Sequence, residues 1–203
     1  MPLQSLSNGL ADAVEAIAPS LLGLKGRRRA GTAFAVGDGR AVTAAHLVGK
    51  KSGTVLLPDG SSTDAKVLGV APAYDLALLE VDAELPVAPW SEGLRVGNLV
   101  VPLGYGPRAT LGLVGRLGGA WRTNAGAEIS QWIEIDGSLP PGFSGGPLVD
   151  ATGGIVGMNT HHLVRGGTTI PADTLQRVVE VLAQRGTVKP GFLGIGAATG
   201  AGA

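Results

Sequence analysis

The chain has 203 residues, enough for one large domain or two small ones with a buried core. Its 16 Lys and Arg residues balance 16 Asp and Glu residues, which argues against a general nucleic-acid or membrane-surface role. The absence of cysteine excludes disulfides, thiolate metal sites and a cysteine nucleophile. No apolar run reaches the roughly 18 residues that a membrane span requires, so no span is predicted.

The N-terminal segment, residues 1–30, is predicted to hold one helix and a basic loop. Over the first 22 residues, apolar side chains recur at helical spacing, at Leu10, Ala13, Val14 and Ile17. Pro19 ends this helix. The basic run that follows carries no aromatic residue, which favours a solvated loop over a nucleic-acid site. This run comprises Lys25 and 27–29.

Between Gly31 and about Ile170 the sequence is a series of short β-type runs separated by turns. The 34 glycines and 13 prolines of the chain provide many turn positions. No helical pattern lies between the runs, which excludes a doubly wound α/β sheet and favours barrels or a sandwich. The predicted strands are 32–36, 41–44, 54–57, 66–70, 76–81, 98–103, 111–116, 131–135, 146–149 and 155–159.

Two barrel-like halves and a final helix complete the predicted organisation. The charged, proline-containing stretch 82–95 is predicted to cross between the halves, which span about 31–85 and 95–170. Helix 173–185 follows, with an apolar stripe along one face. The Gly- and Ala-rich residues 191–203 are predicted to form a frayed tail.

Three residues are candidates for nucleophilic catalysis. His46 ends a predicted strand and is one of only three histidines; Asp75 directly precedes another strand, and Ser144 lies in a glycine-rich run. Hydrolysis of an amide needs a strong nucleophile, a base to take its proton and a group to hold that base. Ser144, His46 and Asp75 are predicted to fill these three roles.

The glycine-rich run also suits an oxyanion hole. Such a hole needs backbone N–H groups that point at one spot, with no side chain crowding the carbonyl. The amides of Gly142 and Ser144 can converge in this way, because glycines on both sides allow a tight turn.

Three motifs together resemble the chymotrypsin-like (trypsin-like) serine proteases, and among them the HtrA (Deg) branch. They are Thr43-Ala44-Ala45-His46, Asp75-Leu76-Ala77-Leu78 and Gly142-Phe143-Ser144-Gly145-Gly146-Pro147. The likeness covers about residues 10–196. It implies an all-β fold with a double six-stranded β-barrel, an N-terminal helix and a C-terminal helix, and a protease domain over 31–190.

The resemblance implies a role for each motif residue. Ser144 attacks the carbonyl carbon, His46 acts as general base and then as general acid, and Asp75 orients His46. The amides of Gly142, Phe143 and Ser144 form the oxyanion hole or lie beside it.

The resemblance also implies where the substrate lies. Thr160 helps to hold the aspartate and lies with His161 and His162 beside the substrate, and one imidazole lines the specificity pocket. Ser138, six residues before the nucleophile, forms the base of that pocket. Because no carboxylate is present there, we expect cleavage after small-to-medium apolar residues and poor cleavage after Lys or Arg.

Two other interpretations of these residues are weaker. The Gly-x-Ser-x-Gly pattern at Ser144 also fits the nucleophile elbow of α/β-hydrolases, with Asp150 and His161 or His162 as partners, but the required helices are missing. His161 and His162 also suggest a metal pair, yet neighbouring residues on a strand point to opposite faces. A solvent-facing pair of histidines stays open as the alternative to an imidazole in the specificity pocket. No metal and no cofactor are predicted.

Departures from the family pattern define the alternatives. Phe143 stands where HtrA members usually carry Asn, which motivates a second hypothesis, a catalytically silent module that binds peptides by β-augmentation.

The family usually has a PDZ domain after the protease, and this chain is expected to stop where one would begin. The aromatic residues of the N-terminal segment of trimeric members are missing before Phe34. A homo-oligomer therefore stays open, and a trimer is not predicted.

The sequence thus predicts a serine endopeptidase that hydrolyses peptide bonds of protein substrates. The resemblance implies unfolded or misfolded proteins as substrates, a role in protein quality control, and an extracytoplasmic location, either periplasmic or secreted. No nucleic-acid partner is expected.

Overall fold

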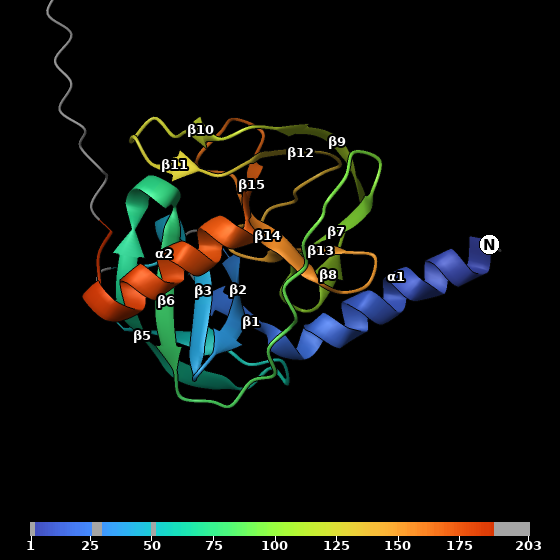
Figure 1. Cartoon of the computed structure of the whole chain (residues 1–203). Helices are drawn as coiled ribbons and strands as arrows, with labels where there is room; N and C mark the ends of the chain where they lie inside the picture. The colour runs from blue at the N-terminus through green and yellow to red at the C-terminus, as the bar shows by residue number, and fades with distance from the viewer. Residues whose placement is uncertain (1–2, 26–29, 50–51, 189–203) are drawn as a thin grey trace, which may run out of the picture.

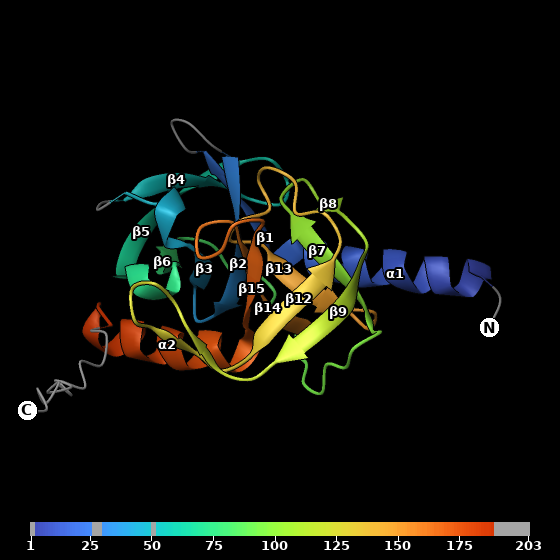
Figure 2. The same ribbon diagram turned by 90° about the horizontal axis from the view of Figure 1, so that it is seen from above.

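The computed structural model describes residues 3–25, 30–49 and 52–188. Two groups of antiparallel strands lie side by side, and one long helix flanks each of them (Figure 1, Figure 2). The predicted tail 191–203 and residues 26–29 of the predicted basic loop lie outside the described residues.

The first group is a closed six-stranded barrel in the order β1-β2-β3-β6-β5-β4. It closes where β1 pairs with β4, with Gly23 opposite Leu56. Its interior is filled by small and branched side chains, among them Ala33 and Val55. Its strands are β1 (Leu21–Lys25), β2 (Ala30–Gly37), β3 (Arg40–Ala44), β4 (Gly53–Leu56), β5 (Ser62–Ala71) and β6 (Leu76–Val81).

The second group is a curled sheet in the order β12-β9-β7-β13-β14-β15, with β8 paired to β7. The edge strands β12 and β15 lie close together, so the sheet forms a nearly closed second barrel. Strands β10 (Trp121–Arg122) and β11 (Glu128–Ile129) form a separate ribbon. The strands of the curled sheet are β7 (Leu99–Gly104), β8 (Arg108–Ala109), β9 (Gly112–Gly118), β12 (Trp132–Asp136), β13 (Pro147–Asp150), β14 (Ile155–Thr160) and β15 (Thr168–Pro171).

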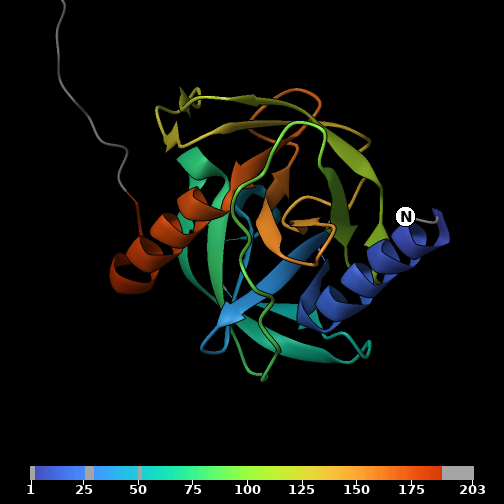
Figure 3. The same cartoon turned by 45° about the vertical axis from the view of Figure 1, so that its right-hand side comes forward.

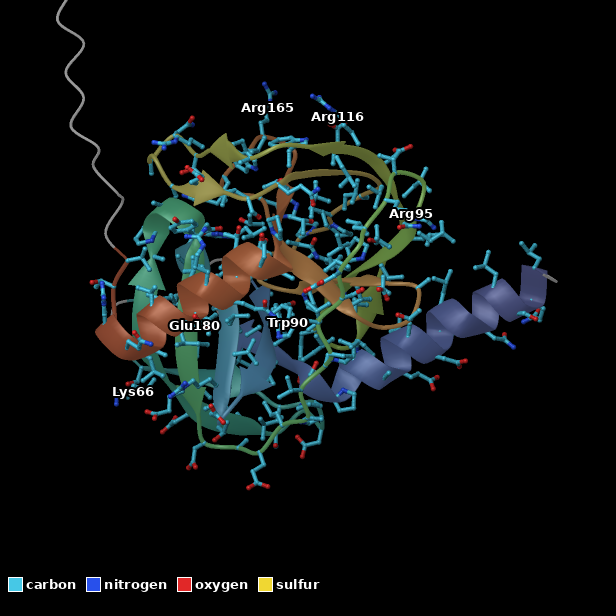
Figure 4. The ribbon with its side chains drawn as sticks, in the orientation of Figure 1. Lys66, Trp90, Arg95, Arg116, Arg165 and Glu180 are labelled. Carbon is cyan, nitrogen blue, oxygen red and sulfur yellow. The ribbon has the colours of Figure 1, made fainter. Side chains whose placement is uncertain are left out.

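A continuous apolar core joins the two barrels. It takes Phe34 and Leu78 from the first barrel and Leu103 and Met158 from the second, all fully buried. Trp90, labelled in Figure 4, comes from the segment that crosses between the barrels. It packs edge-on against Phe34, with ring centroids 6.3 Å apart. Because the strands at this junction are buried on both faces, β14 is apolar or hydrogen-bonded at every position and does not alternate.

The two helices cover different faces. Helix α1 (Leu3–Ile17) buries Ala13 and Ile17, whereas its N-terminal half extends away from the body (Figure 3). Helix α2 (Ala172–Arg185) follows the second barrel and packs on β5 and β6 of the first barrel as well as on β14 and β15 of the second. It is capped by Gly186 in the left-handed region. Among the described helices, none combines the length and the apolar character that crossing a membrane requires.

The β13–β14 turn anchors the crossing segment through Asp150. Ser91 donates a hydrogen bond to its carboxylate, as do the hydroxyl and amide of Thr152 and the amide of Gly154. Partial burial raises the pKa of Asp150, but these hydrogen bonds outweigh it and hold the pKa below its usual value. The carboxylate therefore organises the turn in its charged form.

The predicted fold is confirmed, but five strands of the described structure were not predicted: β1, β8, β10, β11 and β15. All ten predicted strands are present, within a few residues of their expected bounds. Strand β1, however, lies inside the segment 1–30 that was predicted to be helix and loop. The helix ends at Ile17, a 3₁₀ turn over Ala18–Ser20 redirects the chain, and the following leucines close the first barrel.

Candidate active site

The predicted triad lies at the junction of the two barrels. His46 belongs to a 3₁₀ turn (Ala45–Leu47) directly after β3, and Asp75 follows a second such turn (Pro72–Tyr74) before β6. Ser144 comes from the second barrel, in the loop that leads into β13. Two residues therefore come from one barrel and the third from the other.

His46 and Asp75 form a close, largely buried pair. His46 Nδ1 lies 3.0 Å from Oδ1 and 2.9 Å from Oδ2 of Asp75, and the His46 amide also donates to Oδ1 at 3.0 Å. The carboxylate can only accept, so Nδ1 carries the hydrogen of the neutral imidazole and Nε2 is its basic nitrogen. The geometry thus selects the tautomer that a general base needs.

Asp75 is held from several sides. Its side chain is 1% exposed, and Thr160 Oγ1 donates a hydrogen bond to Oδ2. Its backbone carbonyl accepts from the amide of Ala45 at 3.0 Å. Its φ of +49° lies in the left-handed region, which is uncommon for a residue other than glycine. The turn is therefore arranged to aim this carboxylate at His46.

The loop that carries Ser144 is held by strand β2 of the other barrel. The amide of Thr32 donates to the Ser144 carbonyl at 3.1 Å, and its hydroxyl donates to the Gly142 carbonyl at 2.8 Å. The same hydroxyl accepts from the amide of Tyr105 at 2.9 Å. Thr32 thus ties the nucleophile loop to the first barrel.

Gly145 permits this close approach. Its φ is +81°, and a Cβ atom there would lie 2.1 Å from the Thr32 carbonyl oxygen and 2.4 Å from Thr43 Oγ1. Its amide donates to the carbonyl of Asn159 on β14 at 2.8 Å. Only glycine fits between the two barrels at this point.

The hydroxyl of Ser144 is bound by His161 in this structure. His161 Nε2 lies 2.6 Å from the Leu139 carbonyl oxygen, which can only accept, so Nε2 carries the hydrogen. Nδ1 is then an acceptor, and it lies 2.9 Å from Ser144 Oγ. The His161 amide also donates to Oγ, at 3.2 Å. Among the hydrogen bonds of the described residues, none joins Ser144 Oγ to His46.

His162, the neighbour of His161 in the sequence, covers the His46 ring. The rings of His162 and His46 stack, with centroids 5.2 Å apart and planes inclined by 21°. The His162 amide donates to Thr160 Oγ1 at 3.0 Å, so the chain turns sharply after β14. The assumption that His161 and His162 lie on an extended strand is therefore wrong. Each of them contacts a different member of the predicted triad.

The oxyanion loop differs from the expectation at Phe143. Its ring is buried against Gly104 and away from the cleft, under the guanidinium of Arg108, and its amide donates to the Pro140 carbonyl at 3.2 Å. The amides of Gly142 and Ser144 make no backbone hydrogen bond among the described residues. Of the three amides predicted for an oxyanion hole, those of Gly142 and Ser144 are therefore the ones left to donate to a ligand.

A cavity of about 620 Å³, here called the site cavity, is lined by His46, Ser144 and His161. Of the four residues predicted to contact the substrate, His161 is the one in this lining. Thr160 is fully buried against Asp75, and His162 stacks on the His46 ring. Ser138 is exposed outside the cavity, and its carbonyl accepts from Thr110 Oγ1 at 3.0 Å. The next residue, Leu139, lines the cavity instead. The lining residues are Ala30, His46, Leu47, Leu139, Pro141, Gly142, Ser144 and His161.

Two features of the site were not found from the sequence. Thr32 lies in an ordinary strand pattern, and nothing in that pattern signals its contact with a loop more than a hundred residues away. The Leu139 carbonyl that orients His161 is a backbone group, so no side-chain type in the sequence predicts this contact.

Within the described residues, no three His, Asp or Glu side chains gather in a way that would hold a metal ion.

A histidine–aspartate pair facing a serine between two antiparallel barrels defines the class of trypsin-like serine proteases. The chain belongs to this family, since the model of the trypsin-like peptidase domain matches residues 31–158.

The relatives of the chain are HtrA proteases. It is 34% identical over 182 residues to the probable periplasmic serine endoprotease DegP-like of Brucella suis biovar 1 (strain 1330). This alignment covers 81% of the chain but only 35% of the relative. Among solved structures, the HtrA-type protease AlgW with tripeptide has a TM-score of 0.74 at 29% identity, covering 88% of this chain and 65% of that one. Deg5 has a TM-score of 0.78 at 27% identity, covering 93% and 100%. The predicted resemblance to the HtrA branch is therefore confirmed.

The fit of Gly145 between the barrels predicts a large loss of stability in Gly145→Ala. Gly126→Ala is the matched control, because Gly126 has a similar φ of +84° with nothing within 4 Å of an added Cβ. The control should lose about 1 kcal/mol in unfolding free energy, the usual cost of the backbone conformation. Gly145→Ala should lose at least about 3 kcal/mol, because the clash adds to that cost. Urea unfolding measures both, and equal losses would contradict the close contact.

Proposed function

We propose that the chain is a serine endopeptidase that hydrolyses peptide bonds of protein substrates through Ser144, His46 and Asp75. One observation carries the proposal: the buried Asp75 holds His46 Nδ1, which leaves the basic Nε2 in the same cavity as the Ser144 hydroxyl. Asp75 then stabilises the imidazolium that forms when His46 takes a proton.

The first chemical step forms an acyl-enzyme. Ser144 Oγ attacks the carbonyl carbon of the substrate while its proton moves to His46 Nε2. The negative charge that develops on the carbonyl oxygen is stabilised by the amides of Gly142 and Ser144. As the C–N bond breaks, His46 gives the proton to the leaving amine.

The second chemical step releases the product acid. Water gives a proton to His46 and attacks the acyl carbon, the oxyanion forms again at the same two amides, and Ser144 leaves with the proton from His46. No metal or cofactor takes part in this scheme.

Turnover requires a rearrangement at His161. The Ser144 hydroxyl donates one hydrogen, and in this structure His161 Nδ1 is the atom that accepts it. His161 also lines the cavity where the substrate side chain must enter. We infer that the substrate displaces His161 and that the hydroxyl then turns to His46.

Unfolded or misfolded proteins outside the cytoplasm are the proposed substrates. The cleft lies between two barrels, so a chain must enter it in an extended form that a folded protein rarely offers. The Brucella relative, 34% identical over the aligned region, is named a periplasmic protease, which supports the proposed extracytoplasmic location.

A catalytically silent peptide-binding module remains the second candidate function. The hydrogen bond between Ser144 and His161, in place of one to His46, is the observation that favours it. Such a module would bind unfolded casein without cleaving it.

Replacing the nucleophile tests the proposed function. Ser144→Ala should abolish cleavage of casein, with a loss of about 10⁴-fold or more in kcat, because the bond-forming atom is gone. Ser61→Ala, an exposed serine in a distant turn, is the control and should keep full activity. Circular dichroism verifies that both variants are folded. Unchanged cleavage by Ser144→Ala would refute the assignment, and no cleavage by the wild type would favour the silent module.

Removing the competing imidazole should raise activity. His161→Ala should increase kcat/KM on a peptide substrate by about two- to tenfold, the worth of one neutral hydrogen bond. His162→Ala is the matched control, because it leaves the Ser144–His161 bond intact and should not produce this gain. A hundredfold loss in His161→Ala would contradict the scheme, since it would make His161 the base.

The lining of the site cavity predicts the specificity at the residue before the cleaved bond. Leu139 and the imidazole of His161 line it, and no lining residue within the described structure is a carboxylate. A Lys or Arg side chain would be desolvated there without a counter-charge, at a cost of several kcal/mol. Mass spectrometry of casein digests should show cuts mainly after Val, Ala, Ile or Leu. Predominant cuts after Lys or Arg would contradict this assignment.

A further inference from the structure

A second cavity, of about 410 Å³, adjoins the site cavity. Ala30 and Gly142 line both, so the two cavities meet at the loop that carries Ser144. The ring of Tyr105 is part of the lining of the second cavity. A Cβ on Gly23 would lie 2.6 Å from that ring, and the Tyr105 hydroxyl donates to the Leu57 carbonyl at 2.7 Å. Both contacts hold the ring in its place in the lining.

The charged residues that line the second cavity are both basic. Lys25 lies at the end of β1 and Arg108 lies on β8, and both side chains are exposed. Neither forms a salt bridge in the part of the chain that the structure describes. No lining residue of this cavity in that part of the chain is acidic.

Arg108 is positioned close to the nucleophile loop. Its Nη1 donates to the Pro141 carbonyl at 3.2 Å, and its guanidinium lies over the Phe143 ring, 5.1 Å from the centroid. The Pro141 contact engages one of the five N–H donors of the guanidinium. The remaining N–H groups of the Arg108 guanidinium can reach a ligand in the second cavity.

The position of Gly142 indicates which part of the substrate chain would occupy the second cavity. Leu139 and His161 line the site cavity alone, whereas Lys25 and Arg108 line the second cavity alone, with Gly142 between them. If the residue before the cleaved bond occupies the site cavity, the chain after that bond continues across Gly142 into the second cavity.

We propose that Lys25 and Arg108 make this protease prefer substrates with an acidic side chain in the first three residues after the cleaved bond. The inference rests on the proposed function and deepens it. A carboxylate there would meet two cations at the protein surface, where one guanidinium can form charge-assisted hydrogen bonds to it. A lysine at the same place would be repelled.

Two peptides test the preference directly. Both are fluorogenic, have amidated C-termini and carry valine before the cleaved bond; they differ only in Glu or Gln at the second and third residues after it. The wild type should cleave the Glu peptide with a kcat/KM about three- to tenfold higher at low salt, because one or two surface ion pairs form. At about 0.5 M salt the ratio should fall toward one, since exposed charges are screened.

Variants assign the preference to the two cations. Arg108→Gln and Lys25→Gln should each lower the Glu-to-Gln ratio, and Arg108→Lys should retain part of it. Arg116→Gln is the control and should leave the ratio unchanged, because Arg116 lines neither cavity and extends outward from β9 at the edge of the molecule (Figure 4). The ratio is taken within each variant, so an effect of Arg108 on the nucleophile loop cancels.

The outcomes separate the two proposals. Cleavage of both peptides at equal rates, or a ratio that survives in Arg108→Gln and Lys25→Gln, overturns this inference and leaves the proposed function intact. If the wild type cleaves neither of these peptides nor casein, the proposed function fails and this inference fails with it.

Discussion

The site exists only because the second barrel places the loop that carries Ser144 against the first barrel. Thr32 of β2 provides the contact, with its amide on the Ser144 carbonyl and its hydroxyl on the Gly142 carbonyl. The apolar core that continues between the barrels keeps this arrangement rigid. A shift of about 1 Å between the barrels would separate the serine from the histidine–aspartate pair, and such a shift can cost about a hundredfold in rate. Packing and function therefore depend on the same interface.

The buried Asp75 is the electrostatic counterpart of this constraint. A carboxylate that is 1% exposed would be strongly unfavourable if it were alone. The imidazole and amide of His46 and the hydroxyl of Thr160 offset that cost with hydrogen bonds. These groups come from both barrels, so the charge stays satisfied only when the fold is complete. The same bonds hold His46 in the tautomer that the chemistry needs.

Much of the fold could be predicted because its signals are local. Short β-type runs between turn residues gave the ten central strands, and three motifs located the predicted triad. Strand β1 was missed because the short apolar run Leu21-Leu22-Gly23-Leu24 directly follows an apolar helical pattern, and such a run has no period that distinguishes a strand from a helix.

The details of the site depended on tertiary contacts that local patterns do not encode. Phe143 motivated the hypothesis of a catalytically silent module, yet its ring is buried beneath Arg108, and only its amide, which donates to the Pro140 carbonyl, is unavailable to the predicted oxyanion hole. The bond between His161 and Ser144 depends on the path of the chain after Thr160, where the amide of His162 bonds back to the threonine hydroxyl. Neither contact follows from residue type or spacing.

The central claim is that His46, and not His161, activates Ser144. The rate at which a fluorophosphonate modifies Ser144, located by peptide mass spectrometry, tests it most directly in the wild type, His46→Ala and His161→Ala. If His46 is the base, the adduct on Ser144 forms at least about a hundredfold more slowly in His46→Ala and no more slowly in His161→Ala. Slow labelling confined to His161→Ala, or no adduct on Ser144 in the wild type, would contradict it.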